Sequence, residues 1–266
     1  MKKRNRTRSG FTLIELLVVI GIIGILASLL LSVLAKAKYR ANRGKCVSNV
    51  GEISKALSIF ADDHGGRYPW QLLPADQRLH FGGHSPFSTK AIVSTAAMKD
   101  LLGTPKILRS PCDPEALPHN EKAQEQWSIY DCWKSKFINC EAMSYVFGLG
   151  ATTGRTGTIL VLTKNVSKLD IKWARFVGAD EKNPHPNAFA SLNKGGHWAT
   201  AGGDAAQAKD SGLQEKAKYH AESSGGIFKG PASTKLIGCC GEKPKTNKPK
   251  KPKTNKPKKP KTNKPK

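Results

Sequence analysis

Glu15 is the only charged residue between Ser9 and Ala35, and it stands at the start of an apolar run. A carboxylate at the edge of a membrane helix is costly, so it needs a partner or a place in the first helical turn, where the helix dipole favours an anion. If the chain were cut after Gly10, the new amine of Phe11 would lie about one turn from Glu15, and both conditions would be met. The alternative is that Glu15 lies at the headgroup boundary of an uncut anchor.

The sequence lacks the short motifs that carry common catalytic chemistry. There is no H-E-x-x-H and no G-x-S-x-G, and the stretch from Gly148 to Thr156 has the wrong spacing for a P-loop, with Arg155 where lysine is required. His197, beside Trp198, fits a loop or core histidine better than a catalyst. We therefore expect no enzymatic activity, no catalytic residue and no cofactor.

The apolar run after Glu15 predicts a membrane segment. Leu16 to Ala35 are twenty residues without a charge, and as a helix they would extend about 30 Å, enough to cross the hydrocarbon core of a bilayer. A secretory signal peptide is the alternative, but its apolar region is normally about 7 to 15 residues long and ends at a cleavage site. Here the run is longer and continues into further helical sequence.

The residues from Gly10 to Glu15, Gly-Phe-Thr-Leu-Ile-Glu, resemble the prepilin leader junction of type IV pilins and type II secretion pseudopilins, and the resemblance continues through Leu16 to Ile20. It implies that a prepilin peptidase cuts between Gly10 and Phe11 and that the same enzyme N-methylates Phe11. It also implies that Glu15 pairs with the Phe11 amine of a neighbouring subunit during assembly. The expected partners are therefore the peptidase, other pilin or pseudopilin subunits, and membrane lipid.

Charge counts leave the direction of insertion open. The positive-inside rule gives a tie, because five basic residues precede the span (Lys2, Lys3, Arg4, Arg6 and Arg8) and five follow it (Lys36, Lys38, Arg40, Arg43 and Lys45). The resemblance implies a cytoplasmic leader and an exported domain. It therefore implies a single-pass protein of the bacterial inner membrane, with its soluble domain in the periplasm or at the cell surface after assembly.

The helix is expected to continue beyond the membrane as an amphipathic segment. Apolar residues recur at spacings of four and three on one face (Cys46, Val50, Ile53, Leu57 and Phe60), and the helix should end near Asp62 to Gly66. We therefore divide the chain into a leader (1–10), a transmembrane and assembly helix (11–35), an amphipathic continuation (36–64), a soluble domain (65–242) and a tail (243–266).

The soluble domain is predicted to combine loops, one helix and a small antiparallel sheet. The helix is expected from Ala91 to Leu102, and β-branched and aromatic runs predict strands at Met143 to Phe147, Thr158 to Thr163 and Lys172 to Val177. This sheet would cover the apolar face of the long helix. The resulting fold is α+β and pilin-like, with long loops and a disordered C-terminal tail.

A second, looser resemblance to large pseudopilin-like families covers Cys46 to Trp70, Ser110 to Pro114 and Met143 to Tyr145. Some major pseudopilins hold calcium in a late loop. Here the candidate oxygen ligands (Asp180, Glu181 and Asp204) are not spaced as a recognisable loop, so we expect no calcium site.

Six cysteines in an exported domain favour disulfides, and fifteen connectivities are possible. Cys112 paired with Cys132 or Cys140 is expected, since all three flank loop-rich sequence. Cys239 and Cys240 are adjacent and should bond elsewhere, since a bond between them would be strained. There is no C-x-x-C pair at ligand spacing, so the metal prediction is none.

The end of the chain is strongly basic. Residues 243–266 are three copies of Lys-Pro-Lys-Thr-Asn-Lys-Pro-Lys; they supply 12 of the net charge of +24, and the leader supplies 5. Such a segment cannot form a core and should be an extended arm that binds polyanions in a salt-dependent way, or a solubilising repeat without a partner.

Two functions from different classes follow. The first is a prepilin-like structural subunit, cleaved and N-methylated, that assembles through its N-terminal helix into a type II secretion pseudopilus or a type IV pilus-like filament. The alternative is a membrane-tethered binding module whose basic tail captures DNA or another polyanion.

Overall fold

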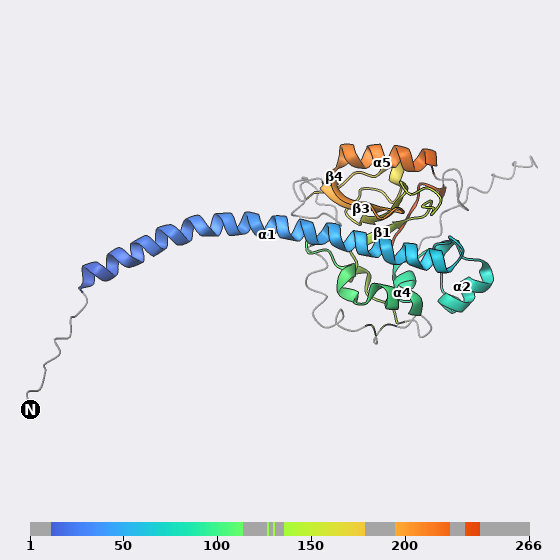
Figure 1. Cartoon of the computed structure of the whole chain (residues 1–266), viewed down its shortest axis with the longest axis horizontal. Helices are drawn as coiled ribbons and strands as arrows, with labels where there is room; N and C mark the ends of the chain where they lie inside the picture. The colour runs from blue at the N-terminus through green and yellow to red at the C-terminus, as the bar shows by residue number, and fades with distance from the viewer. Residues whose placement is uncertain are drawn as a thin grey trace, which may run out of the picture.

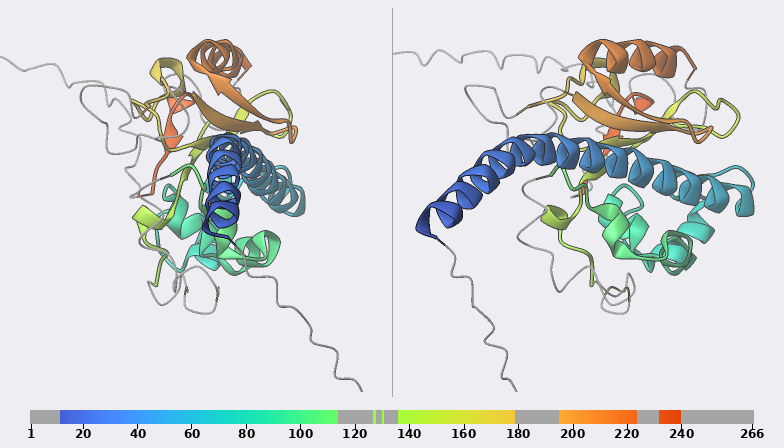
Figure 2. Two further views of the ribbon diagram at one scale, coloured as in Figure 1. Left: turned by 90° about the vertical axis from the view of Figure 1, so that its left-hand side faces the viewer. Right: turned by 60° about the vertical axis from the view of Figure 1, so that its left-hand side comes forward.

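The computed structural model describes residues 12–113, 127, 130, 136–178, 195–223 and 232–239 (Figure 1). A single helix, α1 (Leu13–Asp63), projects with its N-terminal part far from the other described elements. A small domain is built around its C-terminal part. The sheet and α5 (Asp210–Ser223) lie on one side of α1, and short helices lie on the other side (Figure 2).

The end of α1 confirms the prediction from the glycine pair. The amide of His64 and the amide of Gly66 both donate to the carbonyl of Ala61, at 3.0 and 2.7 Å. Gly65 and Gly66 take φ angles of 64° and 77°, in the left-handed region that favours glycine. The chain therefore turns away from the helix axis at the predicted place.

Five antiparallel strands form one sheet in the order β4-β3-β2-β1-β5. Their bounds are Tyr145–Gly148 for β1, Ile159–Thr163 for β2, Gly195–Thr200 for β3, Ala205–Lys209 for β4 and Leu236–Ile237 for β5. The register pairs Val146 with Leu162 and Trp198 with Ala206. The predictions of strands near Met143 to Phe147 and Thr158 to Thr163 are confirmed by β1 and β2.

Strands β1, β2, β3 and β5 are buried, while β4 at the edge is partly exposed, and each face of the sheet has its own core. One core joins the apolar face of α1 to Phe147, Leu160 and Ala199, while the other joins Ile159 and Trp198 to α5. All five residues of β2 are buried, which explains why this strand reads as an unbroken apolar run. The predicted packing of the long helix on a small antiparallel sheet is confirmed, and the fold is α+β.

Short helices cover the side of α1 opposite the sheet (Figure 2). They are η1 (Pro69–Gln71), α2 (Pro74–Phe81), α3 (Thr89–Val93), α4 (Ala96–Leu102) and η2 (Pro105–Leu108). The prediction of one helix from Ala91 to Leu102 is therefore wrong. The helix is broken at Ser94 and Thr95, because the Thr95 hydroxyl accepts a hydrogen bond from the Met98 amide and begins α4 as its N-cap.

The predicted strand from Lys172 to Val177 is also wrong. Asp170 accepts a hydrogen bond from the Lys172 amide and begins a short 3-10 helix, η5 (Ile171–Trp173). The Phe176 amide donates to the carboxylate of Asp210 at 2.7 Å, so only an isolated bridge to Val166 remains. Strands β3, β4 and β5 and helix α5 were not predicted. The short helix η4 (Cys140–Ala142) completes the described elements.

Candidate assembly site at the start of the long helix

The first turn of α1 is closed by reciprocal hydrogen bonds between Thr12 and Glu15. The Glu15 amide donates to the Thr12 hydroxyl oxygen at 3.3 Å, and the Glu15 carboxylate accepts from the Thr12 amide at 2.9 Å. The Thr12 hydroxyl also donates to the same carboxylate oxygen, Oε2, at 2.8 Å. This capping box satisfies otherwise unpaired donors, and it places the carboxylate at the positive end of the helix dipole.

Glu15 thus occupies the first turn, one of the two conditions that its charge requires. Gly10 and Phe11, the expected cleavage and methylation residues, lie outside the described residues, as does the expected tail. The role of Thr12 was missed by sequence reasoning. The spacing Thr12-x-x-Glu15 is the pattern of a capping box before an apolar run and could have indicated it.

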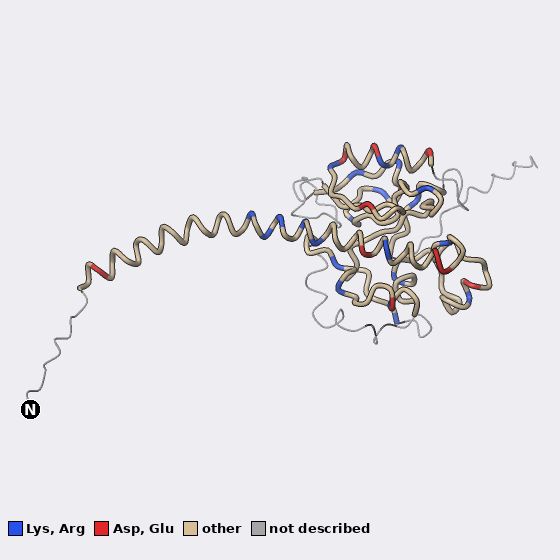
Figure 3. Tube along the Cα trace, viewed as in Figure 1, with Lys and Arg blue, Asp and Glu red and all other residues tan. Residues whose placement is uncertain are grey.

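Everything that follows the cap on α1 is exposed until the helix reaches the domain. Residues 12–41 are all exposed, including Leu13 at 87% and Leu30 at 67%. An 18-residue window of the helix has a mean hydropathy of 2.9, so the helix is long and apolar enough to cross a membrane. Figure 3 shows no charged residue on α1 between Glu15 and the basic residues that begin near the domain.

The C-terminal part of α1 is held by the domain on two sides. Its five predicted apolar residues are all buried, from Cys46 to Phe60. On the sheet side, the Ser54 hydroxyl donates to the carbonyl of Thr200 at 2.6 Å. On the opposite side, the Asn49 side-chain amide donates to the carbonyl of Arg109 at 2.9 Å. The exposed stem therefore extends from a firmly anchored base.

Comparisons with known proteins converge on this same helix. Residues 5–31 match the family described as the prokaryotic N-terminal methylation motif. The type II secretion system core protein G of Aeromonas hydrophila is 44% identical over 66 residues, which are 25% of this chain and 46% of that protein. Through this region the chain is similar to proteins of the type IV pilin-like and pseudopilin family.

Other relatives of the same description match at similar length. The core protein G of Escherichia coli strain K12 is 44% identical over 61 residues, and that of Vibrio cholerae is 37% identical over 62 residues. The matches cover 23% of this chain and 41% and 42% of those proteins. The chain thus spans less than half the length of the curated relatives it matches. No solved structure matches it.

Two of the three segments of the looser resemblance, those that begin at Ser110 and at Met143, meet in space. The Ser144 hydroxyl donates to the carboxylate of Asp113 at 2.6 Å, and the Ser110 amide donates to the Ser144 hydroxyl at 3.0 Å. Lys164 pairs with the same Asp113 oxygen at 3.0 Å. Because all four side chains are buried or nearly so, this network fixes the loop after η2 against β1.

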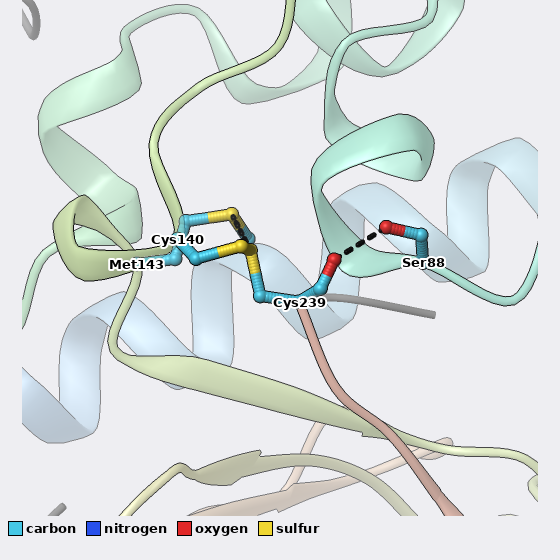
Figure 4. Close-up of a disulfide and its surroundings, with 4 residues drawn as sticks. All are labelled: Ser88, Cys140, Met143 and Cys239. Atoms are coloured by element: carbon cyan, nitrogen blue, oxygen red, sulfur yellow. Dashed lines mark hydrogen bonds between the residues drawn. A yellow bond between two sulfur atoms is a disulfide. The ribbon is translucent and has the colours of Figure 1, made fainter. Parts of the chain in front are cut away.

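The disulfide of the described chain joins Cys140 to Cys239 (Figure 4). The expected pairing of Cys112 with Cys140 is therefore wrong, and Cys132 lies outside the described residues. The pairing of β1 with β5 brings together two cysteines that are 99 residues apart, which local sequence cannot reveal. The carbonyl of Cys239 also accepts a hydrogen bond from the Ser88 hydroxyl at 2.5 Å, so the same strand end is held to the short-helix layer.

His197 is a core residue, as expected. It lies on β3, its side chain is fully buried, and neither ring nitrogen has a hydrogen-bond partner in the described part of the chain. Burial and, to a smaller extent, the charge of Arg43 together lower the pKa of His197 to about 4. The ring is therefore neutral at physiological pH.

Two further histidines meet at the far end of α1. Nε2 of His64 lies 3.0 Å from Nε2 of His80, and the other nitrogen of His64 bonds the carbonyl of Phe60. Burial and the neighbouring His64 lower the pKa of His80. Among the described residues, no group of three histidine, cysteine or acidic side chains could hold a metal ion.

Proposed function

We propose that this chain is a prepilin-like structural subunit, cut between Gly10 and Phe11, N-methylated at Phe11 and assembled through α1 into a type II secretion pseudopilus or a type IV pilus-like filament. The soluble domain then lies in the periplasm, or at the surface after assembly. The partners are prepilin peptidase, lipid, and other pilin or pseudopilin subunits.

One observation carries the proposal. Residues 16–35 of α1 are uncharged, largely apolar and exposed around the whole circumference of the helix, whereas the C-terminal part of the same helix buries its apolar face in the domain. A helix that is apolar on every side needs an apolar environment on every side. Lipid provides that environment before assembly, and the stems of neighbouring subunits provide it afterwards.

Packing between stems is favoured by small residues that let helices approach closely. A Cβ atom added at Gly21 or Gly24 would meet nothing within 4 Å in the single chain, so the surface at both glycines is open to a neighbour. Helices packed in this way would form the centre of the filament, with the domains facing outward.

The geometry of Glu15 suits a second partner. Both hydrogen bonds from Thr12 go to Oε2, which leaves Oε1 to accept from the Phe11 amine of a neighbouring subunit. A methylated amine keeps its positive charge at neutral pH, so this contact would be a charge-assisted hydrogen bond. The cap would then orient the carboxylate that sets the register between stems.

The proposal is tested by the N-terminus of the purified protein after co-expression with a prepilin peptidase. Mass spectrometry should find N-methyl-phenylalanine at Phe11. A Gly10→Leu variant should remain uncut, whereas Gly21→Ala, a substitution within the stem, should be processed normally. An unprocessed Met1 terminus in the wild-type chain would overturn the proposal.

Assembly is tested by removing the carboxylate of Glu15 without changing its size. Glu15→Gln should be processed but should fail to form filaments in cells that overproduce the apparatus. The matched control is Glu52→Gln, which removes an exposed carboxylate from the anchored part of the same helix. If Glu15→Gln and Glu52→Gln both formed filaments, the proposed role of Glu15 in assembly would be contradicted.

A second function is favoured by the composition of the tail. The twelve lysines of residues 243–266 would bind a polyanion through counterion release, with affinity that falls steeply with salt. Deleting the tail should weaken retention on an anionic matrix and flatten the salt dependence. Processing and filament formation should persist if the tail has only this added role.

A further inference from the structure

Two buried thiols meet where the stem enters the domain. Cys46 on α1 is 0% exposed and Cys112, in the loop after η2, is 4% exposed; the two pack against each other as an isolated cluster. Both are thiols in the structure, although the chain carries a disulfide between Cys140 and Cys239.

We propose that Cys46 and Cys112 form a second disulfide, which covalently joins the base of the stem to the loop after η2. Sequence reasoning had placed Cys112 with Cys132 or Cys140, and it had used Cys46 only as an apolar position on the helix.

The side chain of Ser110 bridges the two cysteines. The Ser110 hydroxyl lies 2.8 Å from the Cys46 sulfur, and its oxygen also accepts a hydrogen bond from the Cys112 amide at 3.1 Å. A single side chain therefore contacts both cysteines.

The loop that carries Cys112 is fixed on both sides of this contact. Asn49, one turn beyond Cys46 on α1, donates to the carbonyl of Arg109 at 2.9 Å. On the other side, Asp113 accepts from Ser144 and pairs with Lys164. The loop that carries Cys112 is thus already held against α1 beside Cys46.

The reaction is a thiol–disulfide exchange. One cysteine attacks a small-molecule or protein disulfide as a thiolate, and the mixed disulfide is then displaced by the second cysteine. The Sγ–Sγ bond forms, the oxidant is reduced to two thiols, and the two protons from Cys46 and Cys112 end on those thiols. The hydrogen bond to Cys112 and burial raise the pKa of the Cys46 thiol, so the exchange should occur before the domain closes on the helix.

The cross-link would enclose a defined part of the fold. The segment between the two cysteines contains the last turns of α1 and the whole layer of short helices from η1 to η2. Closing it would tie that layer to the helix at the point where the stem begins. A pull on the stem would then be carried into the domain by a covalent bond as well as by packing.

The inference rests on the proposed function in one respect only, because export would place the two cysteines in an oxidising compartment. The test therefore supplies the oxidant directly. The full chain in detergent is refolded with reduced and oxidised glutathione, alkylated, and digested with trypsin without reduction. The expected product is the peptide of residues 46–55 linked to the peptide of residues 110–122. Alkylated Cys46, or Cys112 linked to Cys132, would overturn the proposal, whatever the N-terminus of the chain proves to be.

The melting temperatures of cysteine variants distinguish a disulfide between Cys46 and Cys112 from simple packing of two thiols. Cys46→Ser and Cys112→Ser should each lower the melting temperature of the oxidised chain by roughly 4 to 16 °C. The melting temperature of the double variant should be no lower than that of either single variant, because all three lack the same disulfide. Cys132→Ser is the matched control and should change neither the linked peptide nor the melting temperature. Additive losses at Cys46 and Cys112 would contradict a disulfide between them.

Discussion

The stem of α1 (residues 12–41) and its base (residues 46–63) are continuous helix but have opposite surroundings. Every residue of the stem is exposed, whereas the base buries ten of its residues between the sheet and the short helices. From Leu16 to Ala35 the stem is uncharged and largely apolar on all sides, whereas the base is apolar on one face only. Apolar content therefore does not decide which part of the helix the domain covers; the periodicity of the apolar residues does.

The sharpest test of this difference compares two neighbouring side chains in the base. Phe60 is 1% exposed and stacks on His64 at a centroid distance of 4.0 Å, while Ile59 is 49% exposed. Phe60→Ala should lower the free energy of unfolding by about 3 to 5 kcal/mol, because it removes buried apolar surface and leaves a cavity. Chemical denaturation in detergent measures it.

Ile59→Ala is the matched control and should cost less than about 1 kcal/mol, as expected for a half-exposed side chain. Equal losses in the free energy of unfolding for Ile59→Ala and Phe60→Ala would mean that the domain does not pack on one face of the base in preference to the other.

A smaller effect is expected from His197, the buried histidine on β3. The pKa of His197 is about 4 in the folded chain, whereas an unfolded histidine titrates near 6.5. Between these values the unfolded chain binds the extra proton, so the free energy of unfolding falls as the pH falls, by at most about 3 kcal/mol at pH 4.

Denaturation curves between pH 7 and pH 4 measure this loss. His197→Gln should flatten the curve, while His84→Gln, which leaves His197 in place, should follow the wild-type curve. An unchanged slope in His197→Gln would show that the proton is taken up elsewhere, for example at His220, whose pKa burial also lowers.

The smallest effect compares the same substitution at two helix caps. Thr12 begins the exposed stem, while Thr95 is 1% exposed and begins α4 within the domain. Thr95→Val should lower the free energy of global unfolding by about 1 kcal/mol.

Thr12→Val should leave global unfolding unchanged, because the first turn of the stem is exposed and makes no tertiary contact with the described part of the domain. It should instead speed amide hydrogen exchange at residues 13–16 by roughly fivefold. A drop in global stability from Thr12→Val would show that stem and domain unfold together.

Local patterns predicted the parts of the fold that depend on local physics. The apolar run, the spacing from Cys46 to Phe60 and the glycine pair after Asp63 place α1 and its end correctly. The runs near Tyr145 and Ile159 predicted β1 and β2 because β-branched and aromatic residues favour strands.

Prediction failed where long-range contacts override local preference. Strand β3 begins with two glycines, which ordinarily weaken a strand. Gly196 is accommodated because its missing side chain leaves room for the ring of Phe176, a residue from a separate segment. The same Phe176 was expected in a strand, but Asp210 on α5 takes its backbone amide instead.

The sequence alone determines that α1 exists, that its first part needs an apolar environment, and that Thr12 and Glu15 can form a capping box at its start. Each of these features depends only on residues within a few helical turns of one another. Only the tertiary structure decides that Cys140 meets Cys239, that Cys46 meets Cys112, and that Asp113 joins Ser144 and Lys164. These contacts join segments 31 to 99 residues apart. Their formation depends on the order of strands in the sheet and on the layers packed around α1, which no local pattern encodes.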